Sequence, residues 1–210
     1  MHLNPFCMCC IINKQEKKIR PFPDENKKSD YMKKVLGVIA GCDEEACTAS
    51  LAVQVQKIYE QYWNIHEDYT HIKHEFNQLM LGLEESLRAS VRKSSDPLAT
   101  ALSYARIGNY IDFAALAKVD KKEILSMIES ENKEPLDPQE YKNFKEDLKK
   151  ASSLVYLTDN CGEIVLDKIA VEILKEKYPL LSVTVIVRGY PVVNDATMED
   201  ARETGLDKIA

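Results

Sequence analysis

Apolar residues recur at helical spacing along most of the first two-thirds of the chain. Over residues 35–65 this pattern predicts helix with a break at Gly41. Over residues 69–94 the spacing predicts one amphipathic helix with a single buried face. The side chains on that face would be Ile72, Phe76, Leu79, Leu83 and Leu87.

Further helices are recognised by their ends. Asp96 and Pro97 predict a helix start, because Asp is favoured as the N-cap and Pro at the first helical position. This helix ends near Gly108. Shorter helices are predicted over residues 121–130 and 138–152, separated by a polar connection that contains proline.

The pattern changes at Ser153. Residues 154–158 form a short continuous apolar run rich in β-formers, as expected for a strand that is buried on both faces. An amphipathic helix follows over residues 163–178, and residues 182–189 resemble the first strand. This order predicts a right-handed βαβ unit with parallel strands.

The chain is therefore predicted to be an α/β protein. A mainly helical N-terminal region, residues 1–150, leads into the first βαβ part of a parallel α/β core, residues 151–210. Two parallel strands cannot be covered on both faces and leave unpaired edges. We therefore expect a core that is incomplete at its C-terminus, and the unpaired edges leave self-association open.

Composition narrows the class of function. The chain has 34 acidic residues against 28 Lys and Arg, a formal net charge of −6, which argues against a nucleic-acid partner. No apolar run approaches the roughly 18–20 residues that span a bilayer, and no secretory signal is recognisable. We therefore predict a cytoplasmic protein with no nucleic-acid or membrane partner. Glycine motifs for nucleotides and a serine-hydrolase elbow are also missing from the sequence.

Candidate chemistry lies directly after the two predicted strands. Asp159 and Asn160 follow the first strand, and Asp195 follows the second. Because ligands of open parallel sheets bind outside the carboxyl ends of the strands, we expect these side chains to converge. Carboxylate and amide oxygens suit a hard divalent cation, and the N-termini of the following helices favour an anion. A cation beside helix ends suits a phosphate ester.

A structural interpretation of the same residues is favoured by their spacing alone, because acidic helix caps after strands are common. Asp159 or Asn160 could cap the helix that begins at Glu163. Asp195 could cap the helix that runs through Thr197, since Asp and Asn are favoured N-caps.

The cysteines and histidines offer weaker candidates. Cys7 and Cys10 have CxxC spacing, and Cys9 lies between them, but a structural zinc needs about four ligands and no second pair is nearby. Cys42 or Cys47 could complete a set. The alternative function is thus a non-catalytic metal- or thiol-binding fragment that uses this cluster. The three histidines of the middle region are expected on the wet side of their helix: His66, His71 and His74.

Several motifs, in order along the chain, resemble one known family. They are PFCMCC near the start, EDYTHIKHEFN (residues 67–77), SDPL (residues 95–98), GNYIDF (residues 108–113), DNCGE (residues 159–163) and RGYPVVNDATMEDA (residues 188–201). Together they resemble the damage-control phosphatase family, a metal-binding family that includes acidic-residue methyltransferase-like proteins. The likeness is to its CxxC-containing branch of archaea and bacteria.

The resemblance implies a metal-dependent hydrolase of small phosphomonoesters with a Rossmann-like α/β core. It assigns a divalent ion (Mg²⁺, Mn²⁺, Co²⁺ or Ni²⁺) to Asp159, Asn160 and Asp195, and Asp159 would also orient the attacking water. Asn109 and Asp112 match the family's GNxxD motif and would line the same crevice with the substrate. Arg188 could contact the phosphate or be a solvated strand-end residue.

The sequence departs from the family in one respect. Family members have a later lysine-glycine motif of the AKGxxN type that helps to hold the phosphate, and no such motif occurs before Ala210. We therefore expect a chain that is shorter than its family's full domain.

Overall fold

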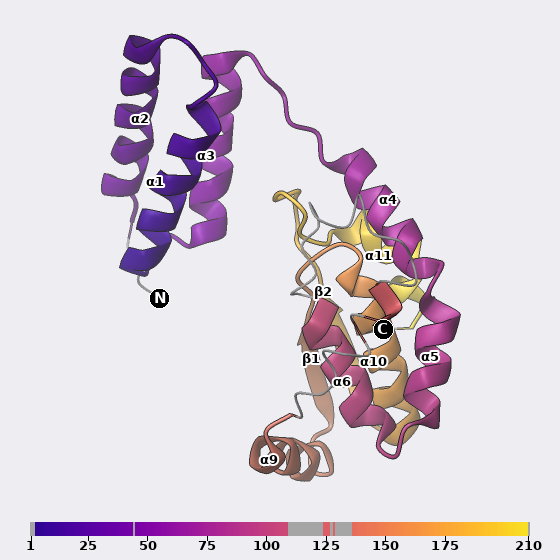
Figure 1. The fold of residues 1–210 in the computed structure, drawn as a ribbon. Coiled ribbons are helices and arrows are strands. Elements are labelled where there is room, and N and C mark those ends of the chain that lie inside the picture. The colour runs from indigo at the N-terminus through magenta and orange to yellow at the C-terminus, as the bar shows by residue number, and fades with distance from the viewer. Residues whose placement is uncertain (1–2, 44, 109–123, 127, 129–135, 210) are drawn as a thin grey trace. The chain divides into compact units, whose positions relative to one another are not determined.

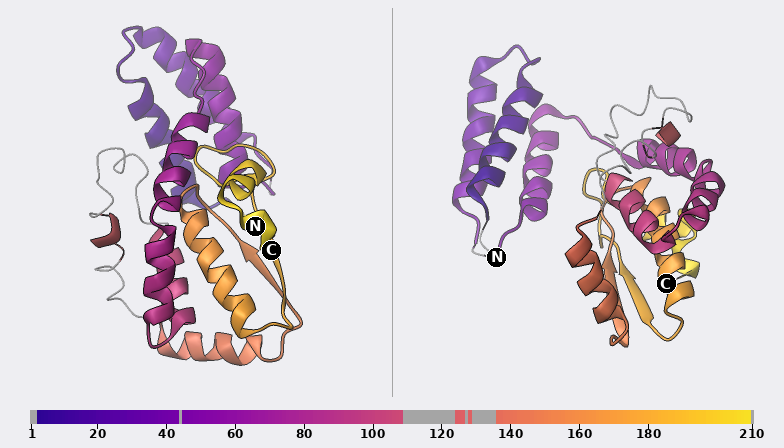
Figure 2. Two further views of the ribbon diagram at one scale, coloured as in Figure 1. Left: turned by 90° about the vertical axis from the view of Figure 1, so that its right-hand side faces the viewer. Right: turned by 60° about the horizontal axis from the view of Figure 1, so that its bottom comes forward.

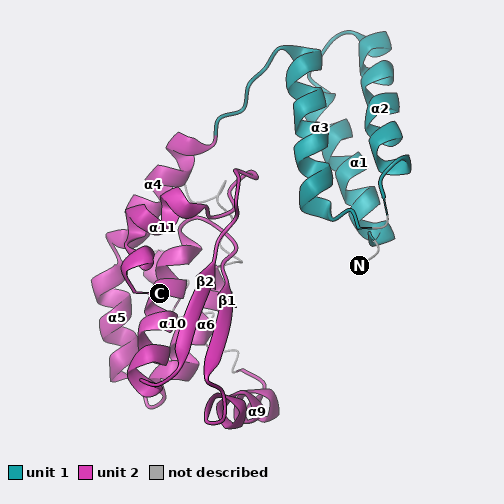
Figure 3. Ribbon diagram, turned by 180° about the vertical axis from the view of Figure 1, so that it is seen from behind, with its two compact units in different colours: residues 1–68 teal, residues 69–210 magenta. Residues whose placement is uncertain are grey.

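The computed structural model of the protein describes residues 3–43, 45–108, 124–126, 128 and 136–209. The chain divides into two compact units, Met1–Asp68 and Tyr69–Ala210, shown in separate colours in Figure 3. The predicted boundary between residues 150 and 151 lies inside the second unit and stays a prediction about domains. No helix in the described ranges is long and apolar enough to cross a membrane.

Unit 1 consists of three helices, α1 (Pro5–Ile19), α2 (Glu25–Ala40) and α3 (Thr48–Trp63), which Figure 1 shows side by side. Local sequence sets their ends. Asn4 accepts a hydrogen bond from the Phe6 amide at the start of α1, directly before a proline at the first helical position. The predicted break at Gly41 is confirmed, because this glycine is the C-cap of α2.

Apolar and aromatic side chains form the core of unit 1. Tyr31, Leu51 and Val55 have no exposed surface. The hydroxyl of Tyr31 donates to Oε1 of Gln15 at 2.6 Å, and Phe22 stacks on the Trp63 ring with centroids 4.0 Å apart. Amphipathic faces that meet in this way are sufficient to hold a three-helix unit.

Unit 2 begins with helices α4 (Thr70–Leu81), α5 (Glu84–Lys93) and α6 (Pro97–Gly108). The prediction of one continuous helix over residues 69–94 is wrong, because the chain turns at Gly82 and Leu83 between α4 and α5. Ile72, expected on the buried face, is 43% exposed. Lys73 is buried instead, because its ammonium group pairs with Asp200 of the later helix α11.

The predicted start of α6 is confirmed. Asp96 lies directly before Pro97, and its Oδ1 accepts a hydrogen bond from the Ala99 amide. After the residues that the structure does not describe, α9 (Pro138–Leu148) precedes the sheet. The predicted helix near residues 121–130 is described only at residues 124–126 and 128, which are helical.

The βαβ unit has the predicted order and direction. Strands β1 (Ser153–Leu157) and β2 (Ser182–Ile186) pair in parallel, with Ser153 opposite Ser182, and α10 (Glu163–Lys177) connects them. Helix α11 (Met198–Thr204) and the 3₁₀ turn η1 (Leu206–Lys208) follow. Two further views of these elements are given in Figure 2.

The sheet is not buried on both faces as expected. Val155 and Leu157 are 54% and 72% exposed, whereas their neighbours Leu154 and Tyr156 pack on the core. The reason is that each strand turns alternate side chains to opposite faces, and the main apolar cluster packs on one of them. Helix α10 packs mainly against α6 beneath that face.

Candidate functional site

The two loops that follow the strands are joined by backbone hydrogen bonds. The amide of Ala196 donates to the backbone carbonyl of Asp159 at 2.7 Å, and the amide of Cys161 donates to the backbone carbonyl of Asn194 at 2.8 Å. Asn160 and Asp195 form an isolated antiparallel bridge between the loops. The residues singled out from the sequence are therefore neighbours at the carboxyl ends of β1 and β2, although about 35 residues of chain separate them.

Neither helix after these loops is capped by a candidate ligand. Gly162 is the N-cap of α10, and a glycine has no side chain with which to cap that end. Helix α11 begins at a capping box made by Thr197 and Asp200. The structural interpretation of Asp159, Asn160 and Asp195 as helix caps is therefore wrong. Glycine and threonine take those positions.

Asn160 connects the two loops through its side chain. Its Oδ1 accepts from Nδ2 of Asn194 at 2.9 Å, and its Nδ2 donates to Oε2 of Glu163 at 3.1 Å. The amide is therefore held with a defined oxygen side and nitrogen side. Sequence reasoning missed Asn194 and Glu163 as partners. Their adjacency to Asp195 and to the DNCG stretch was the only signal that could have found them.

Arg188 pairs with one of the candidate ligands. Its Nε donates to Oδ2 of Asp195 at 2.5 Å, and its backbone amide donates to the carbonyl of Ala196 at 2.9 Å. The Arg188 side chain is 46% exposed while that of Asp195 is 15% exposed. The guanidinium is thus anchored at the site and remains accessible from solvent, which is compatible with binding an anion.

Negative charge is concentrated around Asp159. Burial raises the pKa of Asp195, and the charge of Asp159 adds to the rise while Arg188 opposes it. Burial also raises the pKa of Glu163 to about 7, where hydrogen bonds from Asn160 oppose the change and Asp159 again favours it. Carboxylates that repel one another in this way are stabilised by a nearby cation.

A further buried carboxyl lies one helical turn along α10. Oδ1 of Asp167 accepts from the Tyr156 hydroxyl at 2.6 Å, and its Oδ2 has no hydrogen-bond partner in the part of the chain that the structure describes. Burial raises the pKa of Asp167 to about 8, with added contributions from the charges of Glu163 and Asp159. The protonated form is thus favoured at neutral pH.

The donor set fits a divalent cation. Asp159, Asn160 and Asp195 offer only oxygen ligands, and the mutual repulsion of the carboxylates is what a bound cation would relieve. Within the described residues no three His, Cys, Asp or Glu side chains are grouped closely enough to hold a metal ion. A site here would therefore need the amide oxygen of Asn160 as its third protein ligand.

Two other predicted site residues, Asn109 and Asp112, lie outside the described residues. The histidines are on the wet side as expected, with side chains that are 81% (His66), 78% (His71) and 60% (His74) exposed.

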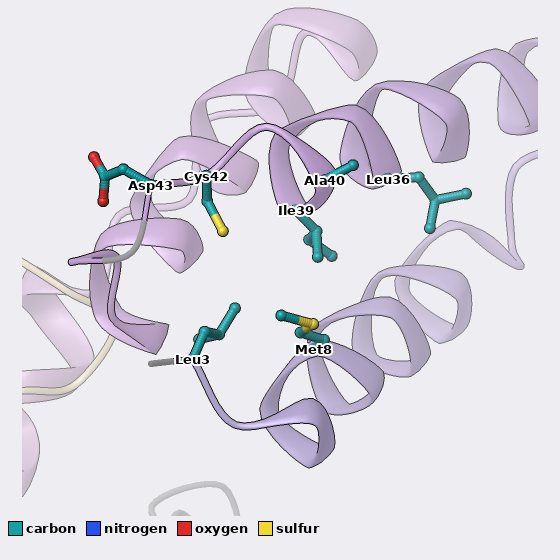
Figure 4. A pocket seen from close by; sticks show the side chains of 7 residues that line it. All are labelled: Leu3, Met8, Leu36, Ile39, Ala40, Cys42 and Asp43. Carbon is teal, nitrogen blue, oxygen red and sulfur yellow. The ribbon is translucent and has the colours of Figure 1, made fainter. Parts of the chain in front are cut away.

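The cysteines do not form a site in the described part of unit 1. Cys9, Cys10 and Cys47 are exposed, Cys7 is half-buried, and no thiol cluster there reaches the three ligands that a metal would need. Cys42 lines an apolar depression between the start of α1 and the end of α2, together with Met8 and Ile39 (Figure 4). Asp43 is the sole charged group among its lining residues, so it lacks the cationic or amide donors that a phosphate needs.

Comparison with known proteins places the chain in a family. The damage-control phosphatase ARMT1-like domain matches residues 3–210. A damage-control phosphatase from Archaeoglobus fulgidus is 28% identical over 214 residues, which cover 100% of this chain and 73% of that protein. A damage-control phosphatase from Pyrococcus horikoshii is 32% identical over 120 residues, 56% of this chain and 40% of that one.

A solved structure has the same fold. The crystal structure of a DUF89 family protein from Pyrococcus horikoshii superposes with a TM-score of 0.74 at 23% identity, covering 100% of this chain and 72% of that one. At this identity the likeness concerns the fold. The family model matches nearly the whole chain: the chain belongs to the damage-control phosphatase ARMT1-like family.

Proposed function

We propose that the protein is a metal-dependent phosphatase that hydrolyses small phosphomonoesters at the carboxyl ends of β1 and β2. The family supports phosphatase activity. The observation that supports this particular site is that Asp159, Asn160 and Asp195 meet across two loops, while other residues cap the helices that follow. A Rossmann-like core that presents its ligands at strand ends is the matching architecture.

The three site residues would bind the metal ion and orient the attacking water. Asp159, Asn160 and Asp195 would hold a divalent ion, which when bound polarises the phosphoryl oxygens and favours deprotonated water. Asp159 also accepts a proton from the attacking water and orients it. The bonds to Asn194 and Glu163 fix the orientation of the Asn160 amide, whose oxygen would also bind the ion.

Arg188 and the start of α10 would bind the phosphate. The Arg188 guanidinium is solvent-accessible at the loop edge, and the α10 N-terminus contributes the positive end of its helix dipole. Asn109 and Asp112 are proposed to contact the substrate as well. A small phosphorylated metabolite as substrate and a cytoplasmic location remain predictions, as does the choice among Mg²⁺, Mn²⁺, Co²⁺ and Ni²⁺.

The test is turnover of p-nitrophenyl phosphate by the purified 210-residue chain, with each of the four ions and with EDTA. We expect turnover that needs a divalent ion and falls by about 100-fold or more in Asp159→Asn, because a metal ligand and the water-orienting group are lost together.

Asp207→Asn is the matched control for charge. This carboxylate is exposed on η1, outside both loops, and its loss is expected to leave turnover unchanged. Metal-dependent turnover that survives in Asp159→Asn would show that the site is elsewhere.

A further inference from the structure

A buried polar cluster lies beneath the two site loops. It consists of Lys73 and Asn77 on α4 and Asp200 on α11, and we refer to these three residues as the α4 polar cluster. Their exposed fractions are 8%, 0% and 4%. Charged and amide side chains are almost never buried to this extent unless every polar atom is matched, so their contacts are informative.

Asn77 and its neighbour Phe76 fix the first loop. The amide of Gly162 donates to Oδ1 of Asn77 at 2.7 Å. Gly162 has a φ of 74°, and a Cβ at this position would lie 2.2 Å from Cε1 of the Phe76 ring. Only glycine fits against that ring with this backbone conformation. The loop is therefore seated on α4 two residues after Asn160.

The same side chain reaches the second loop through Asp200. Nδ2 of Asn77 donates to Oδ1 of Asp200 at 2.9 Å. Oδ2 of Asp200 accepts from the backbone amide and the hydroxyl of Thr197 at 2.7 and 2.8 Å, and from Nζ of Lys73 at 2.6 Å. Thr197 lies two residues after Asp195, so this end of the loop is fixed through Asp200.

The cluster is stabilised as a charged network. Burial alone would raise the pKa of Asp200, but hydrogen bonds from Lys73, Thr197 and Asn77 hold that pKa below its ordinary value. Apolar side chains of similar volume could pack α4 onto α11 with comparable stability. What they could not supply is direction, because hydrogen bonds fix the orientation of both partners and apolar contacts do not.

We propose that Asn77 is a positioning residue for the metal site: its one amide sets the distance and orientation between the loop that bears Asp159 and Asn160 and the loop that bears Asp195. This inference rests on the proposed function. Asn77 does not touch the metal or the substrate. It acts through Gly162 on one side and through Asp200 on the other, and Lys73 keeps Asp200 ionised and in place.

The experiment measures metal affinity in the absence of substrate. Metal-free protein is titrated with Mn²⁺, and the unbound ion is read from its EPR signal. Asn77→Leu removes the hydrogen bonds to Gly162 and Asp200, together with a third from Nδ2 to Oε2 of Glu203. It is expected to weaken Mn²⁺ binding about 10–100-fold, as for other residues that orient metal ligands. Asn77→Ser is less bulky and cannot span both loops, so it is expected to show the same loss if the leucine variant does not fold.

Two controls separate positioning from general destabilisation. Gln78→Ala removes a neighbouring bond from α4 to Glu203, 2.8 Å long, without touching either loop, and is expected to bind Mn²⁺ normally. Val91→Ala opens a cavity at a fully buried position on α5, away from the two loops. It is expected to lower thermal stability without changing the site. Its folded form is expected to retain full affinity.

The outcomes are distinguishable. Suppose that Asp195→Asn loses Mn²⁺ binding but the Asn77 variants bind Mn²⁺ as tightly as Val91→Ala does. That result would overturn the positioning role and leave the proposed function standing. A wild-type protein that binds no Mn²⁺, or an Asp195→Asn variant that binds it normally, would overturn both. The inference would be established if the Asn77 variants bind Mn²⁺ weakly while Gln78→Ala and Val91→Ala bind it normally.

Discussion

The two units of the molecule bury different kinds of side chain. In unit 1 the buried set is apolar and aromatic, and Gln15 is the one polar residue buried among the described residues there. In unit 2 the described buried set includes many polar side chains: Lys73, Asn77, Ser103, Glu163, Asp167, Thr197, Asp200 and Thr204. Most of them lie on α4, α10 or α11, next to the loops that follow β1 and β2.

This difference separates what holds a fold together from what fixes a site. Burial of apolar surface is non-directional and suffices for three helices with matching faces. Burial of charged and amide groups costs free energy unless each is paired, so it is retained where orientation matters. The polar burial of unit 2 is concentrated where two loops must be held in register, and three changes test that contrast.

The largest effect is expected from Lys73→Met in unit 2. The Lys73 ammonium lies 2.6 Å from Asp200, with side chains that are 10% and 5% exposed. Removing one partner leaves a buried carboxylate without its charge partner, which should lower the free energy of unfolding by about 3–5 kcal/mol. Urea unfolding measures the loss, and hydrogen exchange should show faster opening of α4 and α11 than of α1–α3.

Arg20→Met in unit 1 is the matched control. Arg20 pairs with Glu16 on the surface of α1, with side chains that are 65% and 47% exposed. Exposed ion pairs contribute little to stability, so the urea unfolding curve should be nearly unchanged. Equal losses in the two variants would mean that the burial of Lys73 has no special energetic role.

An intermediate effect, which depends on pH, is expected from Asp167→Asn. Burial raises the pKa of this carboxyl to about 8, well above its value in the unfolded chain. Between about pH 4 and 8 the folded state therefore binds a proton that the unfolded state has released, so stability falls as pH rises through this window. Below it both states are protonated and no penalty exists.

Asparagine has no proton to lose, so Asp167→Asn should be less sensitive to pH and more stable than the wild type at pH 9. Its Oδ1 can still accept from the Tyr156 hydroxyl. Thermal unfolding from pH 4 to 9 measures both curves, with Asp207→Asn as an exposed control that should keep the wild-type slope. Parallel curves for the wild type and Asp167→Asn would refute the assignment.

The smallest effect is expected from Tyr31→Phe in unit 1. The Tyr31 hydroxyl donates to Oε1 of buried Gln15, so its removal leaves one uncharged acceptor unpaired. A loss of about 1 kcal/mol is expected in urea unfolding. The double change Gln15→Leu with Tyr31→Phe should recover most of it, because apolar replacements on both sides leave nothing unpaired. Failure to recover would show that the polar pair shapes unit 1 as well.

Much of the local structure could be predicted from the sequence. The α6 start at Asp96 and Pro97, the α2 end at Gly41 and the parallel βαβ order are all confirmed, because caps and hydrophobic periodicity act within a few residues. The failures arise from long-range packing. Ile72 has the right spacing for burial, yet α4 turns Lys73 inward because Asp200 on α11 provides its partner.

The same distinction holds at the candidate site. The sequence shows that acidic and amide residues follow both strands, and membership of the family supports phosphatase activity. It leaves open whether Asp159, Asn160 and Asp195 are helix caps. That ambiguity is resolved only in three dimensions, where Gly162 and Thr197 occupy the cap positions.

The sequence by itself therefore determined most of the elements, the direction of the strands and the residues at their ends. The tertiary structure decided which of those residues are neighbours and how they are held. The Asn77 side chain bonds to residues 85 and 123 positions away along the chain, Gly162 and Asp200. Periodicity and capping act over a few residues, so they contain no information about contacts at such separations, which depend on how the packed helices meet.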